Sequence, residues 1–330
     1  MSAKTNNADV ISFDTFVDGI LSIPVVNLIA VVIGYLGLFL VWTVGGLFLM
    51  LFLMMRHVWR ILTSGVINFD IAGETVVITG GSSGIGLALA KALSFRYPNA
   101  TICVLDVKPI SDPLLVAPNV RYYECDVSDR DSVARVAEKI LQEAGPPALL
   151  VNNAGIVQTG RVWELDPAKT EKVFAVNVLA HFCTVREFLP AMMKRDKGHI
   201  VTVASALGTT GVAQISDYCA SKSAAVGFTE SLRQELSGTN IKTHLVMPGL
   251  VTTDMFAAVH PMTLPFLTPP LSADKLVRSI ITNIERGEHS EVKLPFYTKW
   301  AFLFRLFPPD LADAMRNMFS ANRMLDGVKL

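Results

Sequence analysis

The chain has 330 residues, and its 29 lysine and arginine side chains balance 29 aspartate and glutamate side chains, so the formal net charge is zero. This balance excludes a global basic surface of the kind that binds nucleic acids, and it also excludes a strongly acidic tail. Hydrophobic residues make up 51% of the chain, charged residues only 18%, and the mean hydropathy is +0.42. A composition this apolar indicates a membrane segment attached to a folded domain.

Metal binding has no support in the pattern of cysteines and histidines. The four cysteines lie far apart and the six histidines show no ligand spacing, so we expect no metal site and reduced, buried thiols. We interpret His181, which lies in an apolar helical stretch, as a packed histidine whose ring nitrogens have partners.

The membrane segment lies near the N-terminus, where residues 19–55 contain no charged side chain. A helix crosses the hydrocarbon core with ~20 apolar residues, so this stretch is long enough to span. Its length and the acidic start of the chain argue against a cleaved signal peptide. We favour a single transmembrane helix. The alternative is a bent, re-entrant insertion that uses the glycines Gly34, Gly37, Gly45 and Gly46.

The charges beside the segment predict its orientation. Asp9, Asp14 and Asp18 precede it, whereas Arg56 and Arg60 follow it. The positive-inside rule therefore places everything after the segment in the cytosol.

After residue 70 the sequence alternates short apolar runs rich in β-formers with amphipathic stretches. The pattern predicts strands at residues 75–79, 101–106, 120–124, 148–152, 199–204, 243–247 and 291–294. It predicts helices at residues 85–95, 131–144, 170–193, 217–236 and 273–286. Near-continuous apolar strands are typical of a parallel sheet covered on both faces, so we expect an α/β fold with a doubly wound, Rossmann-type sheet.

A glycine-rich turn, TGGSSGIG at residues 79–86, joins the first predicted strand to the first predicted helix. Glycines here let the backbone turn tightly and approach a pyrophosphate, whose charge the helix N-terminus stabilises. An ordinary glycine-rich loop is the alternative, but the position between a strand and a helix favours a dinucleotide.

Two aspartates at later strand ends extend this interpretation. Asp106 can accept hydrogen bonds from both ribose hydroxyls of NAD and would repel the 2′-phosphate of NADP, although Lys108 could soften that repulsion. We therefore favour NAD over NADP; a simple turn residue is the alternative. Asp126 can reach the adenine amino group, or it can instead cap the following helix together with Ser128 and Asp129.

Tyr218 and Lys222 lie four residues apart, so they share one face of a predicted helix. A nearby ammonium and a positive nicotinamide ring both favour the phenolate, so we expect the pKa of Tyr218 to fall. Lys222 can also reach the nicotinamide ribose. Chance is the alternative, since a tyrosine four residues before a lysine is common on helix surfaces.

Two further polar residues make chance a weaker explanation. Ser205 ends an apolar strand, where its hydroxyl would face the same crevice and hold a substrate oxygen. Asn177 lies within the predicted helix 170–193, where it could anchor a water near Lys222 or could lie on the helix surface.

Together these motifs, with Asn152–Gly155 after the fourth strand and Pro248-Gly249 before Thr253, resemble the short-chain dehydrogenases/reductases over residues 70–330. The resemblance implies that Tyr218 is the general acid/base, Lys222 its pKa-lowering and ribose-binding partner, Ser205 the substrate-orienting hydroxyl and Asn177 the organiser of a relay water. It implies an NAD(P) site formed by Thr79, Gly80, Ser82, Ser83, Gly84, Ile85, Gly86, Asp106, Asp126, Val127, Asn153, Ala154, Gly155, Tyr218, Lys222, Pro248, Gly249, Val251 and Thr253.

A narrower resemblance is to a membrane-bound branch of microsomal retinol dehydrogenases and hydroxysteroid dehydrogenases, some of them on lipid droplets. VNVLAHF (residues 176–182) and DYCASKSAAVGFTESL (217–232) support it, whereas Cys183 and Ser223 depart from it. It implies the endoplasmic reticulum membrane or a lipid droplet, membrane lipids as partners, and a homodimer through residues 170–193 and 217–236.

The expected domain organisation follows from these observations. It consists of an N-terminal flank (1–18), a membrane anchor (19–55), a basic linker (56–70), an NAD(P)-binding catalytic domain (71–294) and a C-terminal, membrane-proximal tail (295–330).

The apolar composition of two segments in the C-terminal third of the chain indicates an apolar substrate. Residues 250–256 and 260–270 are rich in Phe, Met and Leu without a lysine or arginine, which suits a lid over a lipophilic ligand. Simple packing of the lid is the alternative. Residues 300–307 are aromatic but too short to span, and they would either dock at a membrane surface or pack on the domain.

We therefore expect a membrane-anchored oxidoreductase that interconverts a lipophilic alcohol and its carbonyl, of the retinoid, steroid or long-chain lipid class, with NAD or NADP. The alternatives are an NADPH-dependent ketone reductase of lipid synthesis and a catalytically silent membrane scaffold.

Overall fold

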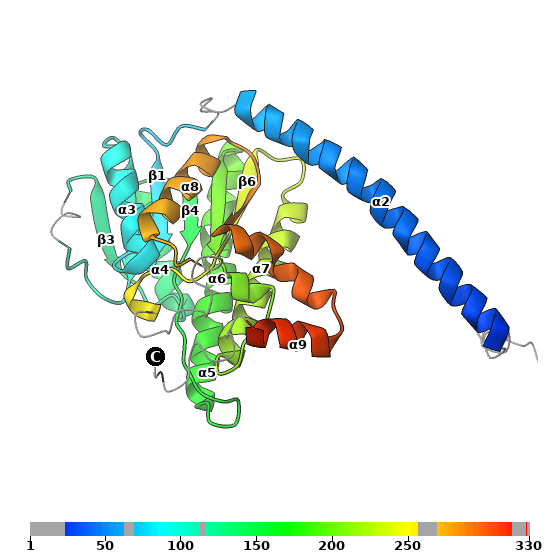
Figure 1. Cartoon of the computed structure of the whole chain (residues 1–330). Coiled ribbons are helices and arrows are strands. Elements are labelled where there is room, and N and C mark those ends of the chain that lie inside the picture. The colour runs from blue at the N-terminus through cyan, green and yellow to red at the C-terminus, as the bar shows by residue number, and fades with distance from the viewer. Residues whose placement is uncertain (1–23, 63–68, 113–116, 257–268, 319–327, 329–330) are drawn as a thin grey trace, which may run out of the picture. The chain divides into compact units, whose positions relative to one another are not determined.

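The computed structural model describes residues 24–62, 69–112, 117–256, 269–318 and 328, and the chain divides into two compact units, Met1–Val66 and Ile67–Leu330. The first unit contains the 39-residue helix α2 (Pro24–Leu62), drawn in blue in Figure 1. The helix runs without a break through Gly34, Gly37, Gly45 and Gly46. By length and composition, its segment Val31–Arg56 can cross a membrane.

The second unit is built on a seven-stranded sheet in which all paired strands run parallel. The strand order is β3-β2-β1-β4-β5-β6-β7. The strands are β1 (Thr75–Thr79), β2 (Thr101–Asp106), β3 (Val120–Glu124), β4 (Pro147–Asn152), β5 (Gly198–Val203), β6 (Ile241–Pro248) and β7 (Ser290–Leu294). The predicted α/β fold with a doubly wound parallel sheet is confirmed.

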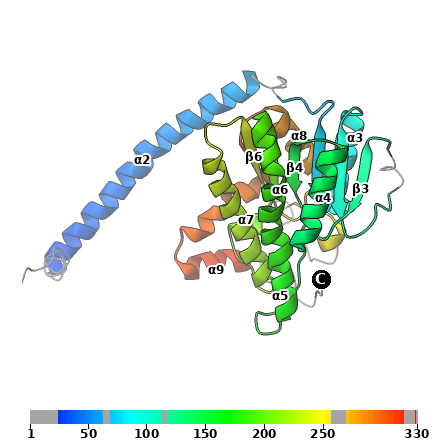
Figure 2. The same ribbon diagram turned by 180° about the vertical axis from the view of Figure 1, so that it is seen from behind.

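Helices cover both faces of the sheet. The helices α3 (Gly84–Arg96) and α8 (Ala273–Glu285) pack on one face, and α4 (Arg130–Glu143), α6 (Ala180–Arg195) and α7 (Ser216–Glu235) lie on the other (Figures 1 and 2). Two hydrophobic cores form, one between the sheet and each layer of helices. In strand β1, Val76 and Ile78 pack in one core and Val77 packs in the other. Alternate side chains of a strand point to opposite faces, so an all-apolar strand serves two cores.

One predicted helix is wrong in detail. Residues 170–193 form three consecutive segments: α5 (Pro167–Phe174), the π-helical turn η2 (Ala175–Leu179) and α6. The wider turn surrounds Asn177, whose side chain bonds to the backbone of Ile156. That partner is distant in sequence, so helical periodicity carries no signal for the turn.

Shorter elements complete the second unit. They are η3 (Ala206–Gly208), η4 (Asp254–Phe256), η5 (Phe296–Arg305) and α9 (Pro309–Met318). Residues 257–268, which hold most of the predicted lid, lie outside the described residues. The segment Pro167–Arg195 also has the length and composition of a membrane span, but half of its most apolar window is buried in this unit, as in a core helix.

The chain order of the strands fixes where a ligand can bind. The chain passes from β1 outward through β2 and β3, and then returns to β4 on the other side of β1. In a sheet of this kind the crevice lies beyond the carboxyl ends of the strands, at the point where the order reverses.

Burial predicts how two phenylalanines contribute to stability. Phe188 on α6 is 0% exposed, whereas Phe95 on α3 is 92% exposed. We expect Phe188→Ala to lower the free energy of unfolding by about 3–5 kcal/mol, because it removes a buried ring and leaves a cavity. Phe95→Ala should change it little. Thermal unfolding of the two variants tests this, and equal effects would contradict the assigned core.

Candidate active site

A cleft of about 440 Å³ lies at the carboxyl edge of the sheet, where β1, β2, β4, β5 and β6 end. Most of the predicted site residues line it. They are Gly80, Ser83, Gly84, Ile85, Asp106, Asp126, Val127, Asn153, Ala154, Gly155, Ser205, Tyr218, Lys222, Pro248, Gly249, Val251 and Thr253. The cleft lining does not include the predicted residues Thr79, Ser82, Gly86 and Asn177.

The glycine-rich turn forms a cradle that side chains would fill. Gly80 has a φ of +65°, and a Cβ atom there would lie 2.8 Å from the Cα atom of Ala154. A Cβ atom on Gly86 would run into the carbonyl oxygen of Gly80. Only glycine satisfies both positions, so the backbone can approach a ligand at the N-terminus of α3.

Hydrogen bonds join this turn to the loop after β4. The hydroxyl of Thr79 accepts from the backbone N–H groups of Asn153 (3.0 Å) and Ala154 (3.1 Å). The amide of Asn153 donates in return to the carbonyl oxygens of Thr79 (2.9 Å) and Gly80 (3.0 Å). Thr79 therefore holds together the loops after β1 and β4, between which the strand order reverses.

The same turn also holds Asp106. One carboxylate oxygen accepts from the backbone N–H of Ser82 at 3.0 Å, and the other accepts from that of Lys108 at 3.1 Å. The Ser82 hydroxyl is buried and has no hydrogen-bond partner among the described residues. A glycine cradle, an orphaned hydroxyl beside it and an oriented carboxylate fit the pyrophosphate and ribose of a dinucleotide.

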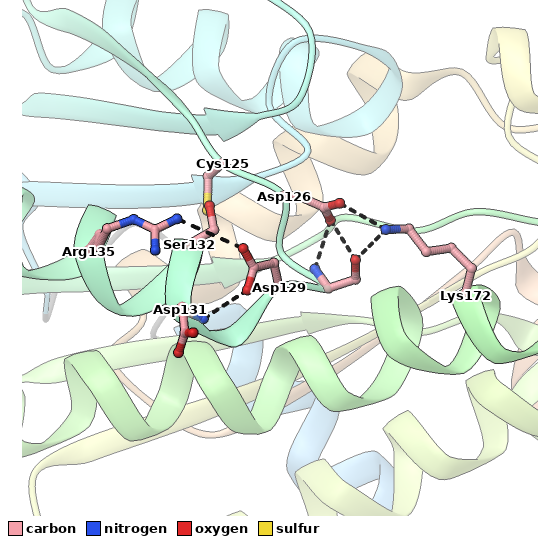
Figure 3. Close-up of polar contacts among 8 residues, drawn as sticks. Cys125, Asp126, Asp129, Asp131, Ser132, Arg135 and Lys172 are labelled. Carbon is pink, nitrogen blue, oxygen red and sulfur yellow. Dashed lines mark hydrogen bonds and ion pairs between the residues drawn. The ribbon is translucent and has the colours of Figure 1, made fainter.

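Asp126 lies at the edge of the cleft in an ion pair (Figure 3). One oxygen accepts from Lys172 Nζ at 2.8 Å, and the other accepts from the backbone N–H and the hydroxyl of Ser128. These bonds lower the pKa of Asp126 against the opposing effect of burial. The helix-capping alternative is wrong for Asp126, because Asp129 is the residue that caps α4.

Tyr218, Lys222 and Ser205 line one end of the cleft. The ammonium of Lys222 lies 5.7 Å from the centroid of the Tyr218 ring and donates to the carbonyl oxygen of Val203 at 2.8 Å. Lys222 is only 3% exposed. Burial lowers the pKa of this lysine to about 8, because an apolar environment disfavours its charged form.

The expected fall in the pKa of Tyr218 does not occur in the protein alone. Burial raises the pKa of this phenol well above 10, and a hydrogen bond from Ser205 opposes that rise only in part. The prediction counted two positive charges, the Lys222 ammonium and the nicotinamide ring of a bound dinucleotide, and it neglected desolvation of the phenol. The free site therefore presents a protonated phenol.

Asn177 is fully buried, so the helix-surface alternative is wrong. Its side-chain oxygen accepts from the N–H of Ile156 (2.9 Å), and its amide nitrogen donates to the carbonyl of Ile156 (2.9 Å) and to Ser221 Oγ (3.0 Å). Protein groups use both of its donors. Asn177 thus ties the loop after β4 to α7, the helix that carries Tyr218.

The residues that hold the start of α7 were not predicted. Asp217 is buried, accepts from the backbone N–H of Tyr218 at 2.7 Å, and also accepts from the side-chain amide of Gln158 at 2.8 Å. Lys172 and Ile156 also line the cleft without having been predicted. Each depends on a contact between distant segments, which no local motif encodes.

Comparisons with known proteins agree with this geometry. A sequence profile described as short chain dehydrogenase matches residues 74–263. The chain is 38% identical over 226 residues to short-chain dehydrogenase/reductase family 16C member 6 of Bos taurus, covering 64% of this chain and 71% of that protein. It is 37% identical to epidermal retinol dehydrogenase 2 of Homo sapiens, covering 64% and 72%.

Two further similarities extend the comparison. The chain is 36% identical to estradiol 17-beta-dehydrogenase 11 of Rattus norvegicus, covering 65% of this chain and 74% of that protein. In fold it is similar to the crystal structure of a short-chain dehydrogenase from Streptomyces avermitilis, with a TM-score of 0.63 and 24% identity, covering 74% of this chain and 96% of that one.

The chain therefore belongs to the short-chain dehydrogenase family. It is an NAD(P)-dependent oxidoreductase that acts on CH–OH groups.

Burial of Lys222 predicts an unusual effect of pH on stability. Its pKa in the folded protein is below the ordinary value of 10.5, so the unfolded chain binds more protons between pH 8 and 10.5. The stability of the wild type should therefore rise with pH through that window. Below pH 8 the buried charge destabilises the fold by on the order of 3 kcal/mol.

We expect Lys222→Met to raise the unfolding temperature at pH 7 and to lose this advantage as the pH rises to 10.5. Lys169→Met, on the exposed face of α5, should behave like the wild type at every pH. Thermal unfolding over this range is the measurement. A loss of stability in Lys222→Met that does not vary with pH would contradict the lowered pKa.

Proposed function

We propose that the protein is a membrane-anchored, NAD-preferring oxidoreductase that interconverts a lipophilic alcohol and its carbonyl compound. The observation that carries the proposal is the group formed by Tyr218, Lys222 and Ser205, which lines the same cleft as the glycine cradle. A proton donor, a buried cation and a hydroxyl donor are therefore held within reach of one dinucleotide site.

In this proposal the reacting oxygen lies between the hydroxyls of Ser205 and Tyr218. A bound nicotinamide dinucleotide supplies or accepts the hydride. In the reducing direction, Tyr218 gives its proton to the oxygen as negative charge develops there, and Ser205 donates a hydrogen bond to the same oxygen. In the oxidising direction, the phenolate must form first. The raised pKa makes this step depend on positive charge in the cleft, which Lys222 provides in part.

Asp106 supports a preference for NAD. Its two oxygens accept from backbone N–H groups, so the carboxylate has a fixed orientation, and the cleft extends past it to Val107 and Lys108. A fixed carboxylate can accept from the ribose hydroxyls and repels a 2′-phosphate.

The substrate class is supported by the apolar side of the cleft and by the relatives. Met255 and Phe256 line the cleft, and Phe256 packs edge-on against Tyr218 with ring centroids 6.0 Å apart. Among the similar proteins, one is named a retinol dehydrogenase and another an estradiol dehydrogenase. We propose a retinoid, steroid or long-chain alcohol as the substrate of this chain.

Membrane attachment in the endoplasmic reticulum or on a lipid droplet is the second part of the proposal. It is supported by α2 and by the exposed aromatic side chains of Phe296, Trp300 and Phe302 on η5. Aromatic residues of this kind favour the interface between lipid and water. The basic residues at the C-terminal end of α2, Arg56 and Arg60, support a cytosolic catalytic domain.

A homodimer is the third part. Leu179, Phe182 and Met193 are exposed on η2 and α6, and the ring of Phe182 packs on that of Phe228 of α7 at 4.6 Å. An apolar face shared by these two long helices is suited to pairing with a second copy.

Tyr218→Phe tests the chemistry. We expect kcat to fall by roughly 10²–10⁴-fold, because the general acid/base is lost, while the Kd for NADH changes little. Tyr123→Phe is the matched control, since that phenol bonds to Glu143 away from the cleft. Nicotinamide absorbance, followed with membranes and a panel of retinoids, steroids and long-chain alcohols, is the measurement. Undiminished turnover in Tyr218→Phe would overturn the assignment.

Asp106→Ser tests the cofactor preference. Removing the carboxylate should raise the affinity for NADPH relative to NADH by roughly tenfold or more. Glu124→Gln is the control, because Glu124 is the register partner of Asp106 on β3 but does not line the cleft. Fluorescence titration with both dinucleotides gives the ratio. A wild type that already prefers NADPH would contradict the proposal.

Protease protection tests the orientation. In sealed microsomes an epitope at the C-terminus should be digested without detergent, because Arg56 and Arg60 at the C-terminal end of α2 favour the cytosolic side. Protection of that epitope until the membrane is dissolved would show a lumenal domain.

A further inference from the structure

Helix α6 turns polar side chains toward the sheet at a place where an apolar face is expected. His181 and Thr184 lie three residues apart and so share one face of the helix. Both are buried, at 2% and 0% exposure. A buried polar group is costly unless its hydrogen-bonding atoms have partners, so this face requires an explanation.

The sheet presents two more polar residues to the same face. Asn152 and Thr202 are register partners at the carboxyl ends of β4 and β5, and both are 0% exposed. Leu150 and Ile200, two residues earlier on each strand, belong to the core under α4 and α6, so Asn152 and Thr202 point to that side as well. A hydrogen bond of 2.6 Å from Thr184 Oγ1 to the Asn152 oxygen joins the helix to the strand.

Four polar atoms of this cluster have no hydrogen-bond partner among the described residues. They are both ring nitrogens of His181, the amide nitrogen of Asn152 and the hydroxyl of Thr202. The sequence-based interpretation of His181 is therefore only half right. The ring is packed, with Phe228 at a centroid distance of 5.8 Å, but its nitrogens are not satisfied by protein groups.

The chemistry of these atoms selects a neutral ligand that both donates and accepts hydrogen bonds. Burial and the nearby charge of Lys222 lower the pKa of His181 to about 3, so at neutral pH the imidazole has one donor and one acceptor nitrogen. The amide of Asn152 adds donors, and the hydroxyl of Thr202 can do either. Water can donate to the acceptor atoms and accept from the donor atoms of this set. An anion would be repelled by the acceptor nitrogen of His181, and a cation would be repelled by the donor groups.

The cluster adjoins the active site at the end of β5. The ammonium of Lys222 donates to the carbonyl oxygen of Val203, the residue that follows Thr202, at 2.8 Å. The ammonium has three donors, and this carbonyl takes one of them.

We propose that Asn152, His181, Thr184 and Thr202 form a buried water site behind the cleft, and that its water extends to the Lys222 ammonium. His181 and Thr202 are then positioning residues that keep a buried charge hydrated. The water site itself is independent of the proposed function, whereas its effect on proton transfer rests on that function.

Two isosteric substitutions test the water site, because a hydrated site and a dry site predict opposite changes in the unfolding temperature. Thr202→Val removes the hydroxyl that has no partner in the described part of the chain, and Thr229→Val removes a buried hydroxyl that donates to the Ala225 carbonyl at 2.8 Å. If water binds at Thr202, both variants of the full chain unfold at a lower temperature than the wild type. If the site is dry, Thr202→Val unfolds at a higher temperature, because an unsatisfied group has been removed, and the proposal is overturned.

A second pair serves if the valine variants do not fold. His181→Gln keeps a donor and an acceptor for water, and His181→Leu keeps neither. A hydrated site predicts that the glutamine variant is the more stable of the two. The reverse order would overturn the proposal.

The pH profile of kcat/KM tests the link to Lys222 separately, because a purely structural role of Thr202 would leave that profile unchanged. Loss of hydration lowers the pKa of the lysine further, so the alkaline break in the pH profile of kcat/KM should move to lower pH in Thr202→Val and stay in place in Thr229→Val. An unmoved break together with a lowered unfolding temperature would overturn the link while leaving the water site. A failure of the proposed function would remove the profile altogether but not the difference in stability.

Discussion

The ammonium of Lys222 is buried at the carboxyl edge of the sheet, where it donates to the Val203 carbonyl and lies beneath the ring of Tyr218. Placing a charge there costs free energy, and the lowered pKa of the lysine measures that cost. Around this charge the structure places a protonated phenol, a serine hydroxyl and a cleft of dinucleotide dimensions. The chemistry of the site depends on keeping the charge buried and the phenol close to it.

The rest of the fold keeps that geometry in place. Parallel strands bring the loops after β1 and β4 together, and the reciprocal bonds of Thr79 and Asn153 lock them. Asn177 then joins the loop after β4 to α7, and Asp217 fixes the first turn of that helix. Apart from the local bond between Asp217 and Tyr218, these bonds join elements that are distant in sequence, as does the bond from the Gln158 amide to Asp217. The position of Tyr218 is therefore a property of the whole domain rather than of one helix.

Much of this arrangement could be predicted from the sequence because local rules encode it. The apolar β-rich runs gave the strands, the glycine-rich turn lay between β1 and α3, and most of the predicted cofactor and active-site residues line one cleft. A sequence motif of this kind records a backbone requirement, as at Gly80 and Gly86, where a side chain has no room.

What could not be predicted depends on burial and on long-range partners. In the protein without dinucleotide, burial raises the pKa of Tyr218, and the spacing of Tyr218 and Lys222 in the sequence does not reveal that burial. The π-helical turn η2, the pairing of Lys172 with Asp126 and the unsatisfied nitrogens of His181 are set by neighbours from other elements. A single sequence lists these residues without showing which of them meet.

The titration of the Lys222 amine tests the buried charge most directly. With lysine labelled at the side-chain nitrogen, and with Lys222→Met used to assign the signal, its resonance can be followed with pH in the protein without dinucleotide. Burial of the ammonium predicts a midpoint near pH 8. A midpoint at the ordinary lysine value of about 10.5 would contradict it, since the ammonium would then be as well solvated as one on the surface.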